Sequence, residues 1–277
     1  MARFSRFEIP ASMSTIPMLL AGGIIIIILA YFALRLRTLN GKGAIATIVI
    51  GMAVLIGGSP SWFILVLTFF VLAAIFTRFR YSIKAQIGFA QDKGGARGWP
   101  NVVANGGIVG ILGILEFISS EPIFVAAFLG AMATAMADTM ATELGLLSKK
   151  APRYVFNLRK TVSPGTSGGI TLVGTVSSIA FSSIIGGVAY SVGLLPIGIE
   201  QIFLIAVVAG VLGTFVDSML GASIQGLYLS EDKKGFTEIR RPDSKLVKGF
   251  RWIDNNVVNV IGTLVGALTA ASLFLIV

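Results

Sequence analysis

The chain of 277 residues contains no cysteine and no histidine. Their absence excludes disulfides, thiolate nucleophiles, imidazole bases and metal sites made of His or Cys ligands. Charged residues are also scarce, at 13% of the chain, whereas soluble domains carry about 25%. Hydrophobic residues make up 55%, and the mean hydropathy is +0.88. This composition indicates a polytopic membrane protein, whose chemistry must use carboxylates, amides, hydroxyls, Lys, Arg or a hard cation held by oxygen.

Long apolar runs predict an all-α fold with about eight transmembrane helices. They approach the roughly 20 residues that a bilayer-spanning helix needs, and they cover 17–34, 44–58, 60–76, 102–118, 122–147, 168–192, 197–224 and 256–277. The second and third runs are short and only Gly-Gly-Ser-Pro separates them, so a seven-helix fold is the alternative. We expect one transmembrane domain over 1–277, in which 1–16 lies on the membrane surface as an interfacial segment.

Basic residues are concentrated in alternate loops. Of the 22 Lys and Arg residues, 20 lie around 35–43 or within the loops 77–101, 148–167 and 225–254. By the positive-inside rule these loops face the cytoplasm and both termini face outward, in a protein that we expect in the cell membrane. Topology then explains most of the net charge of +9, and we expect no nucleic-acid partner. A dedicated site for a polyanion is the alternative reading of that charge.

Two pairs of segments resemble each other across the chain. The segment 86–95 resembles 225–235, and 101–110 resembles 256–266. Both pairs follow apolar runs, the third and the seventh, so helices one to four and five to eight are predicted to form a parallel 4+4 repeat. Chance similarity between glycine-rich apolar segments is the alternative interpretation.

Polar residues from four predicted helices fall at one depth of the membrane, beside the basic loops. They are Asp138, Asp217, Asn101, Asn105, Asn255 and Asn259. An intramembrane carboxylate is unfavourable by a few kcal/mol unless it is paired or hydrated, so this coincidence predicts a wet pocket that holds a cation. Alternatively, each carboxylate pairs with a nearby Lys, including Glu143, which lies about 140° around the helix from Asp138. The asparagines would then cap helices or join them.

A basic and glycine-rich segment follows the helix of Asp138. In 149-KKAPRYVFNLRKTVSPGTSGGI-170 five basic residues precede a Ser-Pro-Gly-Thr-Ser-Gly-Gly turn at the start of the sixth predicted helix. Free backbone N–H groups and the positive end of the helix dipole suit phosphate there, and Thr166 and Ser167 add hydroxyl donors. The turn is not a Walker loop, because Lys160 precedes the glycines. A plain Pro/Gly helix start is the alternative.

Acidic and basic motifs together predict a site for a polyphosphate and its metal ion. Carboxylates such as Asp138 would hold Mg²⁺, while cations such as Lys160 and the amides of the turn would hold the phosphates that Mg²⁺ bridges. The loop 92-DKGGARGWPN-101 repeats the pattern with Lys93 and Arg97. We therefore expect the active site at the cytoplasmic face.

These motifs resemble a known family. It is the integral-membrane family that contains plant phytyl-phosphate kinase and its archaeal and bacterial relatives, and the similar segments are 137-ADTMATELG-145, 160-KTVSPGTSGGIT-171, 93-KGGARGWPNVVANG-106 and 217-DSMLGASIQG-226. The similarity extends over about 38–277. More distantly, Asp-x-x-Ala-x-x-x-Gly followed by Lys-Thr-x-x-x-Gly looks like the signature of dolichol or polyprenol kinases and CDP-diacylglycerol synthases, which are membrane enzymes that use CTP and Mg²⁺.

The resemblance implies phosphoryl transfer from a nucleoside triphosphate, CTP, to an isoprenoid monophosphate of phytyl or geranylgeranyl type, giving the diphosphate. It implies that Asp138 and Asp217 bind Mg²⁺ with help from Glu143, and that Lys160 joins the two aspartates in catalysis. The phosphate-binding residues would be Lys160, Thr166, Ser167, Gly168 and Gly169, with Lys93, Arg97, Asn101 and Asn105 at the acceptor phosphate. A phosphate acceptor is already ionised, so a site without a general base is no obstacle.

Two other functions share these features. A secondary transporter also has repeats, glycine-broken helices and buried acids, although here the acids cluster at one face instead of the midplane. A cytidylyltransferase, which joins CMP to a lipid phosphate, would use the same site. The isoprenoid chain length, the nucleotide base and the oligomeric state stay open at this point.

Overall fold

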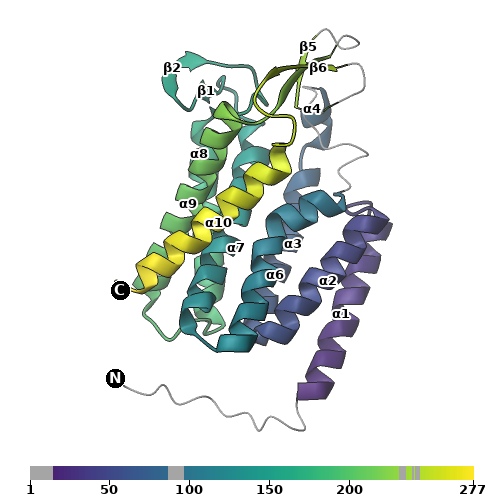
Figure 1. Ribbon diagram of the computed structural model, residues 1–277, viewed down its shortest axis with the longest axis vertical. Coiled ribbons are helices and arrows are strands. Elements are labelled where there is room, and N and C mark those ends of the chain that lie inside the picture. Colours follow the sequence, from purple (N-terminus) through teal and green to yellow (C-terminus); the bar gives the residue numbers. More distant parts are fainter. Residues whose placement is uncertain (1–14, 87–96, 231–234, 239, 241–243) are drawn as a thin grey trace.

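The computed structural model describes residues 15–86, 97–230, 235–238, 240 and 244–277. Within this part of the chain, eight apolar helices alternate in direction along a bundle (Figure 1). They are α1 (Thr15–Arg35), α2 (Gly41–Gly57), α3 (Pro60–Arg78), α6 (Trp99–Ser119), α7 (Pro122–Gly145), α8 (Leu172–Ser191), α9 (Ile199–Ser223) and α10 (Asn255–Phe274). A short helix, α4 (Tyr81–Gln86), follows α3.

Most of the described helices meet the requirements of a membrane span. Six of them, α3 and α6 to α10, are long and apolar enough to cross a membrane, whereas α2 and the Leu19–Arg35 part of α1 are shorter apolar helices. The protein is thus a polytopic membrane protein, as its composition predicts. The second and third predicted runs form separate helices, because Gly58 and Ser59 interrupt them and Pro60 starts α3 where its missing N–H is not needed.

Two loops contain short strands that the sequence analysis did not predict. One antiparallel sheet has the order β2-β1-β3, made of Asn157–Thr161, Arg153–Tyr154 and Gly169–Ile170. The other has the order β5-β4-β6, made of Gly235–Thr237, Leu227–Ser230 and Ser244–Lys248. Both lie at the same end of the bundle, which we call the sheet-bearing end (Figure 1). The all-α prediction holds for the membrane part and is incomplete for the loops.

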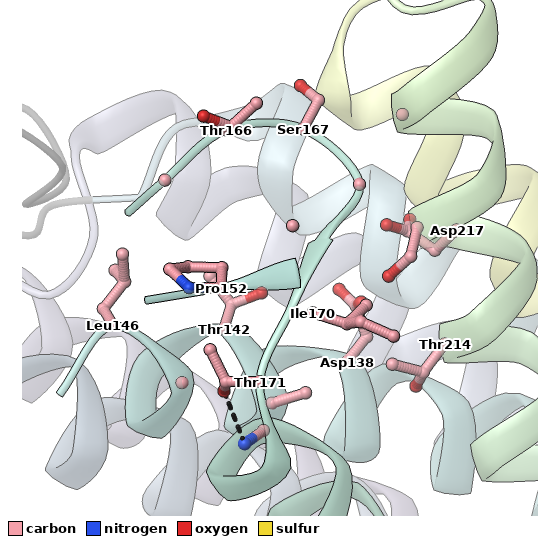
Figure 2. Close-up of a pocket in the computed structure, with 18 of the residues that line it drawn as sticks. Asp138, Thr142, Leu146, Pro152, Thr166, Ser167, Ile170, Thr171, Thr214 and Asp217 are labelled. Atoms are coloured by element: carbon pink, nitrogen blue, oxygen red, sulfur yellow. Dashed lines mark hydrogen bonds between the residues drawn. The ribbon is translucent and has the colours of Figure 1, made fainter. Parts of the chain in front are cut away.

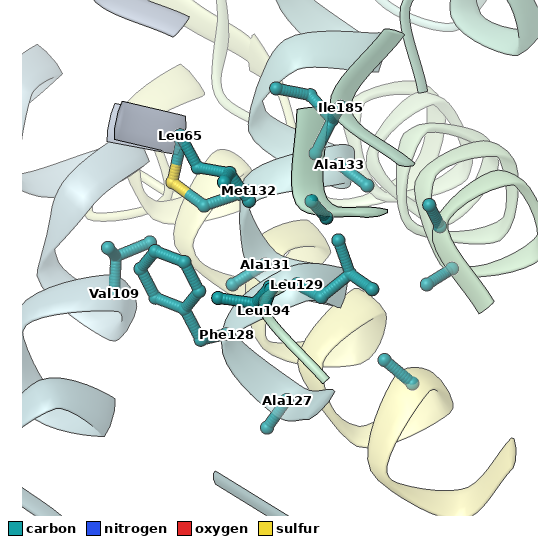
Figure 3. Packing of buried hydrophobic residues seen from close by; sticks show 14 of the residues in the cluster. Leu65, Val109, Ala127, Phe128, Leu129, Ala131, Met132, Ala133, Ile185 and Leu194 are labelled. Carbon is teal, nitrogen blue, oxygen red and sulfur yellow. The ribbon is translucent and has the colours of Figure 1, made fainter. Parts of the chain in front are cut away.

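Helix α7 is the centre of the bundle and packs against α3, α6, α8, α9 and α10. Its buried positions are rich in alanine, and small side chains let helices in a membrane approach closely. Thr134 of α7 donates a hydrogen bond to the carbonyl oxygen of Ala209 on α9 at 3.0 Å, which ties the two helices. Figure 3 shows larger side chains that fill the remaining core, among them Leu65, Phe128, Leu129, Met132 and Ile185.

Helix packing differs between the two halves of the chain. In the first half α2 packs along α6, whereas the corresponding helices α8 and α10 barely touch. In the second half α7 packs along α10, whereas α1 and α6 barely touch. The described residues therefore do not support the predicted parallel 4+4 repeat.

Candidate active site

A cavity of about 220 Å³ lies at the sheet-bearing end, between α7, α8 and α9 (Figure 2). The turn 164–169 forms its roof, and Asn255 at the start of α10 also lines it. We call it the acidic cavity. It brings together six of the predicted site residues, namely Asp138, Thr166, Ser167, Gly168, Gly169 and Asp217.

Two carboxylates from different helices face the acidic cavity. Asp138 comes from α7 and Asp217 from α9, and both lie beneath the turn in Figure 2. Asp217 Oδ2 accepts a hydrogen bond from the side-chain amide of Asn259 on α10, at 3.0 Å, when that amide is oriented to suit its neighbours. Asp138 forms no hydrogen bond or ion pair with another described residue. One acid is therefore oriented by the protein, and the other is free to bind a ligand.

Glycines at two helix crossings bring the acids together. A Cβ at Gly213 on α9 would lie 2.4 Å from Thr134 Cγ2 on α7, so α7 and α9 meet closely only because this residue is glycine. A Cβ at Gly262 on α10 would lie 3.2 Å from Asp217 Cβ. These close approaches place Asn259, one turn before Gly262, beside the carboxylate of Asp217.

The glycine-rich turn differs from the predicted one in where the helix begins. Helix α8 starts at Leu172 with Thr171 as its N-cap, and strand β3 separates it from the glycines. The amide of Gly169 donates to Thr166 O at 2.8 Å, so it is already used inside the turn. Gly168 has a φ of +75°, and a Cβ there would lie 2.3 Å from Ala222 Cβ on α9. The glycines thus shape the roof and seat it on α9, instead of opening a helix.

Glu238, which was not among the predicted site residues, also lines the acidic cavity. Its carboxylate accepts hydrogen bonds from the hydroxyl of Ser167 and, at 2.8 Å, from Nε2 of Gln225. Burial raises the pKa of the Glu238 carboxyl above its ordinary value, and these two hydrogen bonds act in the opposite direction. Glu238 follows β5 in a mixed-charge loop, where no motif distinguishes it from a solvated residue.

The charge of the acidic cavity suits a cation. Three carboxylates line it, those of Asp138, Asp217 and Glu238, and no described Lys or Arg does. No group of three or more described acids lies close enough together to hold one metal ion by itself. A divalent ion here would therefore take one or two carboxylates and complete its shell with water or phosphate oxygens, which is the usual arrangement of Mg²⁺.

Glu143 lies outside the acidic cavity, in a buried cluster with Lys84. Its Oε2 is 2.5 Å from Lys84 Nζ, and its Oε1 accepts a hydrogen bond from Thr77 at 2.8 Å. Lys84 also donates to the carbonyl oxygens of Phe76 and Thr77 at the end of α3. The structure thus favours the alternative reading of Glu143, a carboxylate paired with a lysine, because both of its oxygens have partners.

Lys160, which was predicted to bind phosphate, lies away from the acidic cavity. Lys160 is exposed on β2, and its Nζ lies 5.7 Å from the centre of the Tyr154 ring. Lys93 lies outside the described residues. The predicted meeting of Lys160 with the two aspartates is therefore not found in this arrangement.

The described residues among those expected at the acceptor phosphate lie on another side of α7. Arg97, Asn101 and Asn105 line a second cavity among α1, α2, α3 and α6. Arg97 donates to Thr77 Oγ1 at 3.1 Å. Burial lowers the pKa of the Arg97 guanidinium, and the nearby Glu143 carboxylate opposes this. The structure therefore divides the predicted site between two cavities.

Together the fold and the acidic cavity define a class of protein, a polytopic membrane protein with paired helix-borne carboxylates at one end of its bundle. The chain belongs to the family described as integral membrane protein DUF92, whose model matches residues 24–267. The resemblance seen in the sequence is thereby confirmed at the level of the family.

Several curated proteins are similar to this chain over most of its length. Protein PGR of Arabidopsis thaliana is 27% identical over 266 residues, which cover 86% of this chain and 89% of that protein. An uncharacterized membrane protein of Methanocaldococcus jannaschii is 27% identical over 263 residues, covering 95% and 97%. Protein VTE6, chloroplastic, of Arabidopsis thaliana is 26% identical over 237 residues, covering 84% and 64%. No solved structure matches the chain.

Proposed function

We propose that the protein is a membrane kinase that uses CTP and Mg²⁺ to convert an isoprenoid monophosphate to the diphosphate. One observation carries the proposal: Asp138 and Asp217, from two different helices, face a single cavity beneath the turn 164–169. The resemblance to the family that contains plant phytyl-phosphate kinase supplies the reaction class. The position of the cavity at one end of the bundle, beside a membrane surface, suits a lipid acceptor and a water-soluble donor.

The reaction needs no residue type that the chain lacks. An oxygen of the acceptor phosphate would attack the γ-phosphorus of CTP, the bond from that phosphorus to the β-phosphate oxygen would break, and CDP would leave. The acceptor is already ionised, so no proton has to be removed. The protein has to position two anions and offset their repulsion, which carboxylate-bound cations and hydrogen-bond donors can do.

Residues of the acidic cavity fit these tasks. Mg²⁺ bound there would supply charge neutralisation at the phosphoryl oxygens. Asp138 and Asp217 would be its carboxylate ligands, and Asn259 would keep Asp217 in place. The hydroxyls of Thr166 and Ser167 would donate to phosphate oxygens, with Ser167 exchanging its present acceptor, Glu238, for the nucleotide.

We leave two sets of residues out of the proposed reaction centre on geometric grounds. Glu143 is excluded as a metal ligand because Thr77 and Lys84 occupy its oxygens. Arg97 and Asn101 are excluded from the acceptor site because they line the cavity on the other side of α7. We therefore propose that the chemistry takes place in the acidic cavity.

Product analysis tests the proposal. The purified protein would be incubated with Mg²⁺, CTP or ATP, and prenyl monophosphates of several chain lengths, and we expect CDP and a prenyl diphosphate. Asp217→Asn should lose this activity, while Glu200→Gln, which removes an exposed carboxylate at the opposite end, should keep it. Release of pyrophosphate with formation of a CDP-lipid would instead identify a cytidylyltransferase. Solute flux in proteoliposomes without nucleotide turnover would identify a transporter.

The orientation in the membrane is also a proposal, with the sheet-bearing end in the cytoplasm of the cell, as the basic loops indicate. Because the chain has no cysteine, single cysteines can be labelled without background. In intact cells a membrane-impermeant maleimide should label Glu200→Cys, and it should label Lys149→Cys only after lysis. The reverse pattern would place the acidic cavity outside the cytoplasm and away from CTP.

A further inference from the structure

The second cavity, which we call the slot, is a predominantly apolar space of about 90 Å³. It is lined mainly by residues of α1, α2, α3 and α6, with Met132 from α7. Helix α1 packs on α2 but barely touches α3, so the slot lies along the seam between two helices that face the bilayer. Arg97, Asn101 and Asn105 lie at its sheet-bearing end, where α6 begins.

A small recess continues from the slot past Arg97. It measures about 10 Å³, which is room for about one water molecule or one anionic oxygen. The slot and the recess share Leu39, Phe70 and Arg97, and a second arginine, Arg78, also lines the recess. An apolar space that ends at two arginines has the shape and polarity of a site for an anionic amphiphile.

Positive charge around Arg97 is not balanced by the described residues. Glu143 acts on Arg97 electrostatically, but its two oxygens already bind Lys84 and Thr77. Two cations thus share one carboxylate, and no described Asp or Glu lines the slot or the recess. A guanidinium carries five N–H donors, and burial away from water is unfavourable for a cation without an anionic partner. This imbalance favours binding of an anion beside Arg97.

Two features place this anion at the membrane surface and apart from the acidic cavity. Trp99, two residues after Arg97, is exposed at the start of α6, and tryptophans mark the level of lipid head groups. The acidic cavity lies between α7, α8 and α9, with Asn255 of α10 at its edge, whereas the slot lies among α1, α2, α3 and α6 (Figure 1). A molecule in the slot would therefore be separated from Asp138 by the body of α7.

From this geometry we infer that the slot and the recess bind one anionic phospholipid of the bilayer. A phosphate oxygen of its head group lies against Arg97 and Arg78, the Asn101 amide contacts the same head group, and the first part of one acyl chain lies in the slot. The lipid is a resident component that neutralises Arg97 and fills the space between α1 and α3. It is not the acceptor of the reaction proposed above, and its binding does not depend on that reaction.

Native mass spectrometry of the full chain tests the inference without any nucleotide. The protein would be equilibrated with equal amounts of phosphatidylglycerol and phosphatidylcholine of the same acyl chains. We expect one retained phosphatidylglycerol, preferred over phosphatidylcholine by about tenfold or more, as a charge-assisted contact implies. Arg97→Gln and Arg78→Gln should each reduce that preference severalfold. Lys42→Gln, which removes an exposed charge at the same end, should leave it unchanged.

Each other outcome would overturn the inference. Equal retention of the two lipids, or an unchanged preference in Arg78→Gln, would exclude recognition of the charge by the recess. Arg78 is exposed at the end of α3, so this variant should fold even where Arg97→Gln does not. Displacement of phosphatidylglycerol by a prenyl monophosphate at equal concentration would make the slot an acceptor site. Asp138→Asn should retain the lipid, so a failure of the proposed kinase activity would not affect this result.

Discussion

Helix α7 carries two carboxylates five residues apart, and the protein treats them in opposite ways. Glu143 has Lys84 on one oxygen and Thr77 on the other, inside a cluster that joins α3, α4 and α7. Asp138 faces the acidic cavity and has no such partner among the described residues. A carboxylate inside a membrane protein must be neutralised or solvated. The comparison shows that Glu143 is neutralised by the fold, whereas Asp138 is left without a partner among the described residues.

The largest effect should come from breaking the paired carboxylate. Glu143→Gln would leave Lys84 and Arg97 near each other in a buried site without their shared anion. Removal of one partner of a buried ion pair costs about 3–5 kcal/mol. We therefore expect the free energy of unfolding, measured by chemical denaturation in detergent, to fall by about that amount. The fraction that remains folded should bind Mn²⁺, a spectroscopic substitute for Mg²⁺, as tightly as the wild type.

A double variant provides the matched control for this effect. Lys84→Met with Glu143→Leu removes both charges and keeps an apolar filling of similar volume. Replacement of a buried pair by apolar residues is often close to neutral. The double variant should therefore recover most of the stability that the single variant loses. A double variant as unstable as Glu143→Gln would mean that the shape of the cluster, and not its unbalanced charge, is what matters.

The opposite result is expected from the unpaired carboxylate. Asp138→Asn removes a charge that the protein leaves without a partner, so the thermal unfolding midpoint should stay the same or rise. The proposed Mg²⁺-dependent release of CDP should fall by at least about 100-fold, because a single electrostatic contact at a reacting centre has an effect of that size. Mn²⁺ binding, followed by electron paramagnetic resonance, should weaken in parallel. Wild-type activity in this variant would remove Asp138 from the metal site.

The contrast also shows what could be predicted from the sequence. Asp138 and Asp217 are found at the same depth by counting residues along apolar runs, because a helix rises by a fixed length per residue. Depth does not tell which way a side chain points around the bundle. Asn101 and Asn105 are predicted at that depth as well, yet they line the slot on the other side of α7.

Contacts between residues that are distant in sequence could not be predicted, for a related reason. In the sequence, Lys84 cannot be told apart from the other basic residues of its loop. It is buried against Glu143, 59 residues away, only because the chain turns into α4. Strand β1 has two residues, too few for any alternating pattern to show. Glu238 accepts a hydrogen bond from Ser167, which is 71 residues away in the sequence, because it directly follows strand β5 of the second sheet. Tertiary contacts of this kind carry no local signal.

The shape of the roof can be tested with two glycines that share a backbone conformation. Gly168 and Gly193 have φ values of +75° and +61°, but a Cβ would meet Ala222 at 2.3 Å in the first case and nothing within 4 Å in the second. Gly193→Ala should cost about 1 kcal/mol, from the left-handed backbone alone. Gly168→Ala should cost more and should lower activity as the turn is displaced. Equal losses of stability and unchanged activity would exclude a role for the roof.

The smallest effect concerns the acidic cavity as pH falls. Burial raises the pKa of Glu238, so the folded protein binds this proton more readily than the unfolded chain does. As pH falls through the raised pKa, Glu238 becomes neutral. The folded state then gains stability relative to neutral pH. The acidic cavity also loses one negative charge beside Asp138 and Asp217. As the solution is acidified, Mn²⁺ affinity should therefore begin to fall at a pH above 4.5, which is the ordinary pKa of a glutamate.

Glu238→Gln sharpens this test, because it keeps the size of the side chain and an acceptor for Ser167 while it removes the titrating group. At neutral pH the variant should bind Mn²⁺ about two- to fivefold more weakly, as expected for one charge acting across a partly hydrated cavity. Its affinity should also depend less on pH than that of the wild type, with the remaining dependence coming from Asp138 and Asp217. If both proteins show the same pH profile, the cation is held by the two helix-borne aspartates alone and Glu238 only fastens the roof.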